Sequence, residues 1–287
     1  MPRLMLSGVL LLVMMILISG LPLVQAMPPD LAHRSPQCAP GLRQTMQPTA
    51  QTATLPPFPE AELQAILNPN LGTFAVMVYD EQTGTLIVAQ QPDRVFYSAS
   101  LIKLPIAMAL YHLADEGLID LNEELELHAE DIVPGSGSMQ QQPIGTRRSL
   151  GRLCAEMLYE FDNNTVSNMI LERIGFDAVN NLMDDLGATQ THVERLFFDF
   201  TPGPETIETS PADMLRLLQG LSEQQQAGNT TAQVLLANMF INADREKIAG
   251  LLPPGTRVMN RSGFVPGIEH DAGVVETLIR MHAVISW

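Results

Sequence analysis

A serine and a lysine three residues apart begin the apolar run that starts at position 100, as Ser100-Leu101-Ile102-Lys103. Apolar residues recur at three- and four-residue steps as far as Leu113, which predicts a helix. Positions i and i+3 share one helix face, so the Ser100 hydroxyl and the Lys103 amine are expected to point the same way. The start of a helix also offers free backbone N–H groups, which suit a nucleophile that generates an oxyanion. A buried lysine with a depressed pKa can take the proton of such a serine.

The same residues have a purely structural alternative. Ser100 would then cap the helix and Lys103 would be a solvated side chain. A pattern with two fixed letters does not separate the two interpretations. The rest of the chain has to decide between them.

Two further polar segments fall where a site would need them. Asp162-Asn163-Asn164 lies in a break between two predicted helices, and Arg261-Ser262-Gly263 ends a predicted strand. A cation and a hydroxyl at a strand edge can bind a substrate carboxylate. The backbone N–H of Phe264 would then lie near the substrate carbonyl. The structural alternatives are a helix cap at the first segment and a turn at the second.

These three segments, in this order and spacing, resemble the class A β-lactamase family, which carries Ser-x-x-Lys, Ser-Asp-Asn and Lys-Thr/Ser-Gly motifs. Penicillin-recognising serine D,D-peptidases share the set. The resemblance extends from about Glu60 to the C-terminus. The other segments that carry it are 96–100, 131–137, 209–214 and 267–273.

The resemblance implies a mechanism and a set of residues. Ser100 would attack the lactam carbonyl and form an acyl-enzyme, and Lys103 would assist its deprotonation. The backbone N–H groups of Ser100 and Phe264 would form the oxyanion hole, and water activated by a glutamate would release the product. No cofactor and no metal is implied. The implied substrate-binding residues are Asn164 for the acylamide side chain, Arg261 and Ser262 for the carboxylate, and the neighbouring Gly263 and Phe264.

The middle motif departs from the family pattern at its serine. Alignment back from Thr165 puts Asp162 in its place, whereas alignment forward from Cys154 puts Phe161 there. A carboxyl at Asp162 can shuttle a proton, and a phenyl ring cannot. In the last motif, Arg261 replaces a lysine, which keeps the charge on a longer, forked side chain.

The segment expected to carry the deacylating glutamate, 193–201, also matches poorly. Counting back from Pro211 selects Glu194, and counting forward from Asn164 selects Phe198. Glu194 and Asp199 are the candidate bases, and each has a solvated loop carboxylate as its alternative. With a base, the chain is expected to hydrolyse β-lactams. Without one it would be a penicillin- or peptidoglycan-binding protein, or a D,D-peptidase-like hydrolase, with little lactam turnover.

Length and charge limit the partners. The chain has 287 residues and a net charge of −16, from 16 basic and 32 acidic residues. Such a charge repels nucleic acid and anionic lipid. We expect a small β-lactam or peptidoglycan-like substrate, no nucleic-acid partner and a monomer.

The N-terminal residues predict export. Arg3 precedes an apolar run over 4–18, and Val24-Gln25-Ala26 has the small residues of a cleavage site. We therefore expect a signal peptide over 1–26 and a periplasmic or extracellular protein. An uncleaved segment would instead anchor the chain in a membrane.

The remaining pattern predicts the fold class. Residues 27–59 are rich in Pro, Gln and Thr and predict a linker, so the domain is expected to span 60–287. Strands are expected at 72–79 and 85–90, helices from 100 to about 252, and strands again at 257–261, 272–277 and 281–287. This order predicts an α+β fold, in which an antiparallel sheet is built from both chain ends around an inserted all-helical lobe. We expect the final helix that the resemblance implies to be missing.

Overall fold

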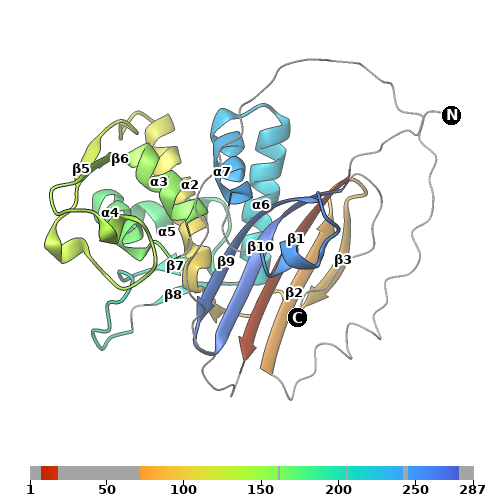
Figure 1. Ribbon diagram of the computed structural model, residues 1–287. Coiled ribbons are helices and arrows are strands. Elements are labelled where there is room, and N and C mark those ends of the chain that lie inside the picture. The colour runs from red at the N-terminus through yellow and green to blue at the C-terminus, as the bar shows by residue number, and fades with distance from the viewer. Residues whose placement is uncertain (1–7, 19–71, 161, 205, 242–244, 278–287) are drawn as a thin grey trace.

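The computed structural model describes residues 8–18, 72–160, 162–204, 206–241 and 245–277. Figure 1 shows an antiparallel sheet beside a group of helices, with α6 and α7 lying along one face of the sheet. The chain therefore has the predicted α+β fold. The expected linker over 27–59 and the third returning strand at 281–287 lie outside the described residues.

The main sheet has five strands in the order β3-β2-β1-β10-β9, and each neighbouring pair is antiparallel. The returning strands are longer than the sequence predicted, because β9 continues through the Arg261-Ser262-Gly263 segment and β10 begins at the next turn. The strands are β1 (Gly8–Ile18), β2 (Gly72–Asp80), β3 (Thr85–Gln90), β9 (Arg257–Val265) and β10 (Ile268–Thr277).

The central strand β1 comes from the apolar run that predicted a signal peptide. It pairs with β2 on one side and with β10 on the other, so that Leu12 lies opposite both Val78 and Gly273. Its backbone thus completes two ladders of hydrogen bonds. Cleavage after Ala26 would remove this strand from the sheet.

Side chains alternate between the two faces of the sheet, as the two-residue period of a strand requires. On β2, Ala75 and Met77 join the main core under the helices, whereas Val76 and Val78 join a smaller apolar cluster on the opposite face. The 3-10 helix η4 (Ile248–Leu251) contributes Ile248 to that second cluster. Both faces of β2 are therefore covered.

Helix α2 runs through the middle of the main core, and its side chains are buried from Lys103 to Ala107. Helix α6 contacts β1, β2 and β10, and α7 contacts β9. In the described part of the chain, no helix is both long and apolar enough to cross a membrane. The helices are α2 (Lys103–Asp115), α3 (Leu150–Tyr159), α4 (Asn164–Ile174), α5 (Phe176–Asp185), α6 (Pro211–Gln226) and α7 (Thr230–Phe240).

Short strands fix the segments around the helices. The sequence pattern did not predict them, because two- or three-residue strands have no visible periodicity. One small sheet has the order β4-β8-β7, and the other pairs β5 with β6. Their bounds are β4 (Phe96–Tyr97), β7 (His192–Val193), β8 (Ile207–Thr209), β5 (Glu124–Glu126) and β6 (Arg147–Ser149).

Candidate active site

Ser100 lies in a tight turn immediately before α2. The 3-10 helix η1 (Ala99–Ile102) contains Ser100, and Lys103 follows as the first residue of α2. Side chains at i and i+3 eclipse one another in a 3-10 helix, which keeps the serine and the lysine on one side. The N-cap of α2 is Ile102, so Ser100 does not have the capping role of the structural alternative. Ala99 has a φ of 47°, an uncommon value for a residue with a side chain, directly beside the candidate nucleophile.

Lys103 is fully buried, and its amine has a defined partner. Its Nζ donates a hydrogen bond of 3.0 Å to Oδ1 of Asn164. Burial holds the pKa of Lys103 well below its usual value, and the positive charge of Arg261 lowers it further. Asp162 acts in the opposite direction and raises it. A lysine in these surroundings favours the neutral amine, which is the form that accepts a proton.

The Asp162-Asn163-Asn164 segment forms a turn at the start of α4. Asn163 caps the helix by accepting the N–H of Val166 at 3.4 Å, and Asn164 is its first residue. The Nδ2 of Asn164 donates to Oδ1 of Asp162 at 2.6 Å and to the carbonyl of Pro134 at 3.1 Å. A chain of hydrogen bonds therefore runs from Lys103 through Asn164 to Asp162.

This geometry favours Asp162 over Phe161 as the residue in the serine position of the middle motif. Phe161 itself lies outside the described residues. Asn164 differs from its expected role, because both N–H donors of its amide are used inside the protein. In this conformation it orients Lys103 and has no donor left for a substrate acylamide.

Strand β9 forms the other wall of the site and carries Arg261. Arg261 is 2% exposed, and its guanidinium donates to the backbone carbonyls of Ser100, Leu158 and Glu160, each at 3.3 Å. It therefore joins η1, the end of α3 and β9. These three bonds hold the guanidinium beneath the surface. Arg261 therefore has a structural role in addition to its expected role in binding a carboxylate.

The rest of the β9 motif lies against the backbone of η1. A Cβ at Gly263 would be 3.1 Å from the backbone nitrogen of Ser100 and 3.0 Å from the carbonyl oxygen of Ser98, so glycine permits this close approach. Ser262 is buried, whereas the Phe264 side chain is 57% exposed. Because β9 is an edge strand of the described sheet, its outer backbone groups face η1.

The two candidate bases are not brought to this cluster. The carboxylate of Glu194 accepts the backbone N–H of Thr206 at 3.0 Å, and its residue is exposed. Asp199 is also exposed, and hydrogen bonds from Thr201 lower its pKa. Both carboxylates belong to the outer side of the loop. Among the described residues, no hydrogen bond or ion pair joins Glu194 or Asp199 to Ser100, Lys103 or Asn164.

Phe197 of this loop faces the site, and the counts along the sequence missed it. Its ring centroid lies 5.2 Å from Nζ of Lys103. Asn168 holds it there, since its side chain accepts the Phe197 N–H at 2.8 Å and donates to the Phe197 carbonyl at 3.0 Å. Both groups are buried. An asparagine in the first two turns of α4 was the available signal, but only the folded chain shows which loop residue it holds.

The arrangement has the parts needed for acyl transfer to a serine. Ser100 is the candidate nucleophile, and the buried amine of Lys103 lies in surroundings that favour its neutral form. The edge strand β9 packs against the backbone of Ser100. Among the described residues no cluster of three or more His, Cys, Asp or Glu side chains could hold a metal ion. The chemistry available here is that of a serine and a lysine.

Comparisons with known proteins identify the family of the chain. The model of the β-lactamase enzyme family matches residues 59–286. A β-lactamase of Rhodobacter capsulatus is 25% identical over 177 residues, which cover 60% of this chain and 60% of that protein. The β-lactamase ROB-1 of Haemophilus influenzae is 25% identical over 240 residues, which cover 79% of this chain and 75% of that protein.

Solved structures show the same fold. A β-lactamase from Sphaerobacter thermophilus has a TM-score of 0.60 at 24% identity, covering 69% of this chain and 80% of its own. A variant of PBP-A, described as an acyl-enzyme complex with penicillin-G, has a TM-score of 0.64 at 23% identity. That comparison covers 78% of this chain and 90% of the PBP-A chain.

Proposed function

Because the chain belongs to the β-lactamase enzyme family, we propose that it is a serine hydrolase that opens β-lactam rings by taking the acyl group onto Ser100. The observation that carries this proposal is the environment of Lys103. A fully buried amine with a lowered pKa lies one 3-10 turn from the serine, and Asn164 fixes its direction. Such an amine can act as the general base that activates a hydroxyl nucleophile.

The proposed reaction begins with the neutral amine of Lys103 accepting the Ser100 proton as the serine oxygen attacks the lactam carbonyl carbon. The backbone N–H groups of Ser100 and Phe264 hold the resulting oxyanion, and one such donor is worth about 3 kcal/mol in comparable sites. The ring C–N bond then breaks, and the leaving nitrogen takes up a proton. That proton comes from the Lys103 ammonium, and the carboxyl of Asp162 supplies a path for it.

Binding of the substrate carboxylate is assigned to the β9 side of the site. Arg261 supplies positive charge from below, and the Ser262 hydroxyl is the neighbouring donor. Charge-assisted hydrogen bonds of this kind are about twice as strong as neutral ones. The same pair of groups would bind the terminal carboxylate of a peptidoglycan-like peptide, so both substrate classes fit this wall.

Release of the acyl group is proposed to be slow. Hydrolysis of an acyl-enzyme needs a base that activates water beside the ester. The apolar Phe197 of this loop contacts Lys103, whereas Glu194 and Asp199 are exposed. This observation favours the second candidate function, a penicillin-binding or D,D-peptidase-like hydrolase with little β-lactam turnover, over an efficient β-lactamase.

Pre-steady-state kinetics with a chromogenic cephalosporin test the proposal. We expect a burst of about one ring opened per protein molecule, followed by a much slower phase, as acyl-enzyme accumulation produces. Ser100→Ala is expected to abolish the burst. Rapid linear turnover without a burst would favour an efficient β-lactamase. The absence of both phases would contradict acyl transfer.

A further inference from the structure

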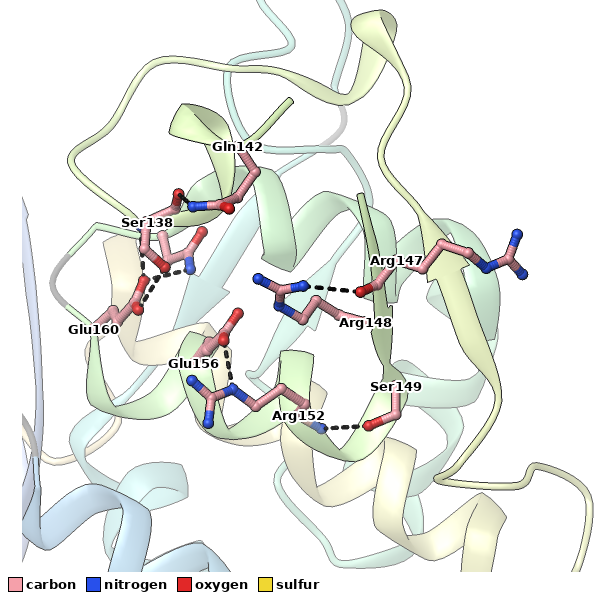
Figure 2. A network of polar contacts seen from close by, with 9 residues as sticks. Ser138, Gln142, Arg147, Arg148, Ser149, Arg152, Glu156 and Glu160 are labelled. Atoms are coloured by element: carbon pink, nitrogen blue, oxygen red, sulfur yellow. Dashed lines mark hydrogen bonds and ion pairs between the residues drawn. The ribbon is translucent and has the colours of Figure 1, made fainter. Parts of the chain in front are cut away.

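Glu160 ends α3 with a carboxylate that three donors share. Figure 2 shows its side chain directed toward Ser138, away from the ion pair between Arg152 and Glu156. One oxygen accepts the backbone N–H of Ser138 at 2.9 Å and Nδ2 of Asn163 at 2.7 Å. The other accepts the Ser138 hydroxyl at 2.7 Å. The carboxylate therefore connects two segments that are distant in sequence.

We name these segments the rim loop, residues 133–138, and the catalytic turn, residues 162–164. The two segments pack so closely that two glycines of the rim loop have no room for a Cβ. A Cβ at Gly135 would lie 2.3 Å from the Asp162 carbonyl oxygen, and one at Gly137 would lie 2.4 Å from the Asn163 side chain. Glycine is needed at both places, because any larger residue would push the rim loop off the catalytic turn.

The catalytic turn holds a backbone conformation that needs support. Asp162 has a φ of 57°, in the left-handed region that aspartate adopts only occasionally. Such a residue persists where its surroundings fix it. Two residues later, Asn164 must present Oδ1 to Lys103 and Nδ2 to Pro134 in the rim loop. A small rotation of the turn would break the first of these contacts.

We propose that Glu160 is a positioning residue for the acylation step. Its carboxylate fastens the catalytic turn to the rim loop, and this fixes the Asn164 amide that orients Lys103. The inference rests on the proposed function of Ser100 and Lys103. It assigns to Glu160 a role that neither the motifs nor the comparisons give it.

The chain supplies a matched control one turn earlier on the same helix. Glu156 is also an acidic residue of α3, and it is 3% exposed. Its carboxylate pairs with Arg152 at 2.5 Å, and no bond to the rim loop is recorded for it among the described residues. Glu156→Ala therefore removes a carboxylate from α3 without releasing the catalytic turn.

The test compares Glu160→Ala, Glu160→Gln and Glu156→Ala by the rate and the concentration dependence of acylation by a chromogenic cephalosporin. We call the three hydrogen bonds of the Glu160 carboxylate, which fasten the catalytic turn to the rim loop, the clamp. Glutamine preserves the clamp, since its carbonyl accepts both N–H donors and its amide donates to the Ser138 hydroxyl oxygen. Alanine removes all three bonds. We expect Glu160→Ala to slow the maximal acylation rate by about 10- to 100-fold, the scale of a misplaced catalytic group. Glu160→Gln and Glu156→Ala should remain within about threefold of the unmodified protein.

Each result is decisive. Equal rates in Glu160→Ala and Glu156→Ala would overturn the proposal, as would a Glu160→Gln rate as low as that of alanine, which would indicate a role for charge. Ser138→Ala should add no further loss in the Glu160→Ala background, because both changes remove one clamp.

Hydrogen exchange separates failure of the clamp from failure of the function. If the unmodified protein forms no adduct, the proposed function fails. The rate of amide hydrogen exchange over 133–140 and 162–166 in the free protein then tests the clamp separately. Exchange faster by about tenfold or more in Glu160→Ala, but not in Glu156→Ala, supports it. Unchanged exchange overturns it.

Discussion

The ring of Phe197 faces the amine of Lys103, with 5.2 Å between the ring centroid and Nζ. This one contact bears on both halves of the proposed reaction. An apolar ring excludes water from the amine, which favours the neutral lysine needed for acylation. The same ring lies against the reacting groups and supplies no base for deacylation.

Replacing that ring by a carboxylate should speed release. We expect Phe197→Glu to shorten the lifetime of a penicilloyl adduct by at least about 100-fold, the lower range for general base catalysis. The decay of the adduct, followed by intact mass after removal of free penicillin, measures the effect. Phe198→Glu is the control, because Phe198 is 41% exposed and packs edge-to-face on Phe200. Equal lifetimes in the two variants would contradict the assignment of Phe197.

Asp162 should set the pH dependence of acylation. Its charge raises the pKa of Lys103 against the larger lowering by burial. Asp162→Asn removes that opposing effect, so the pKa of Lys103 falls and the acid limb of the acylation profile moves to lower pH. The plateau rate should drop by at least about tenfold if the carboxyl carries the proton to the leaving nitrogen. As a control, substitution of the exposed Asp199 (Asp199→Asn) should leave the pH profile of acylation unchanged. If the acid limb of Asp162→Asn moved to higher pH, the direction assigned to the effect of Asp162 on the pKa of Lys103 would be wrong.

His270 should make the fold less stable in acid. It is 1% exposed, and its Nε2 donates to the Tyr97 carbonyl at 2.9 Å. Burial lowers its pKa from 6.5 to about 4, with a further lowering by the charge of Lys247 and opposition from the Tyr97 bond. Above pH 6.5 the imidazole is neutral in both states, and between pH 6.5 and about 4 only the unfolded chain takes up the proton. This group therefore costs up to about 3 kcal/mol of unfolding free energy as pH falls through that window.

The comparison for this effect is His270→Gln, which keeps a donor for the Tyr97 carbonyl and does not titrate. Urea unfolding at pH 7, 5.5 and 4.5 should show a smaller loss of stability in the variant than in the unmodified protein. Parallel pH dependences would show that His270 carries no part of the acid sensitivity.

The N-terminal segment cannot be both a cleaved signal peptide and strand β1 of the sheet in the same molecule. Export with cleavage after Ala26 removes β1, whereas the sheet of the full chain places β1 between β2 and β10. If the chain is exported and cleaved as the sequence predicts, protein recovered from the periplasm of a bacterial host should begin at Met27. We also expect its Tm to be lower than that of the full chain, because two hydrogen-bonded ladders are lost. Recovery of a chain that still begins at Met1 would contradict cleavage.

Sequence reasoning located the parts of the site that depend on local spacing. Ser100 and Lys103 are three residues apart, so their shared side follows from the geometry of one turn. Arg261 and Gly263 were expected at the end of a strand, and β9 carries both. The two-sided order of strands around helices likewise predicted the α+β fold.

The features that sequence reasoning missed depend on contacts between distant segments. Phe197 is selected by its two hydrogen bonds with Asn168, and counting along the loop from either end selects a different residue. The internal use of the Asn164 amide depends on Pro134, thirty residues earlier. The pairing of Gly8–Ile18 with both β2 and β10 likewise joins segments that no local pattern connects.

Intact mass spectrometry of the protein mixed with benzylpenicillin, followed over time beside Ser100→Ala, measures both acyl transfer to Ser100 and its slow release. We expect one penicilloyl adduct per molecule, mapped to Ser100, that persists after free penicillin is removed and is absent from the variant. A short-lived adduct with penicillin consumed would contradict slow release. No adduct and no consumption, or an adduct that survives in Ser100→Ala, would contradict acyl transfer to Ser100.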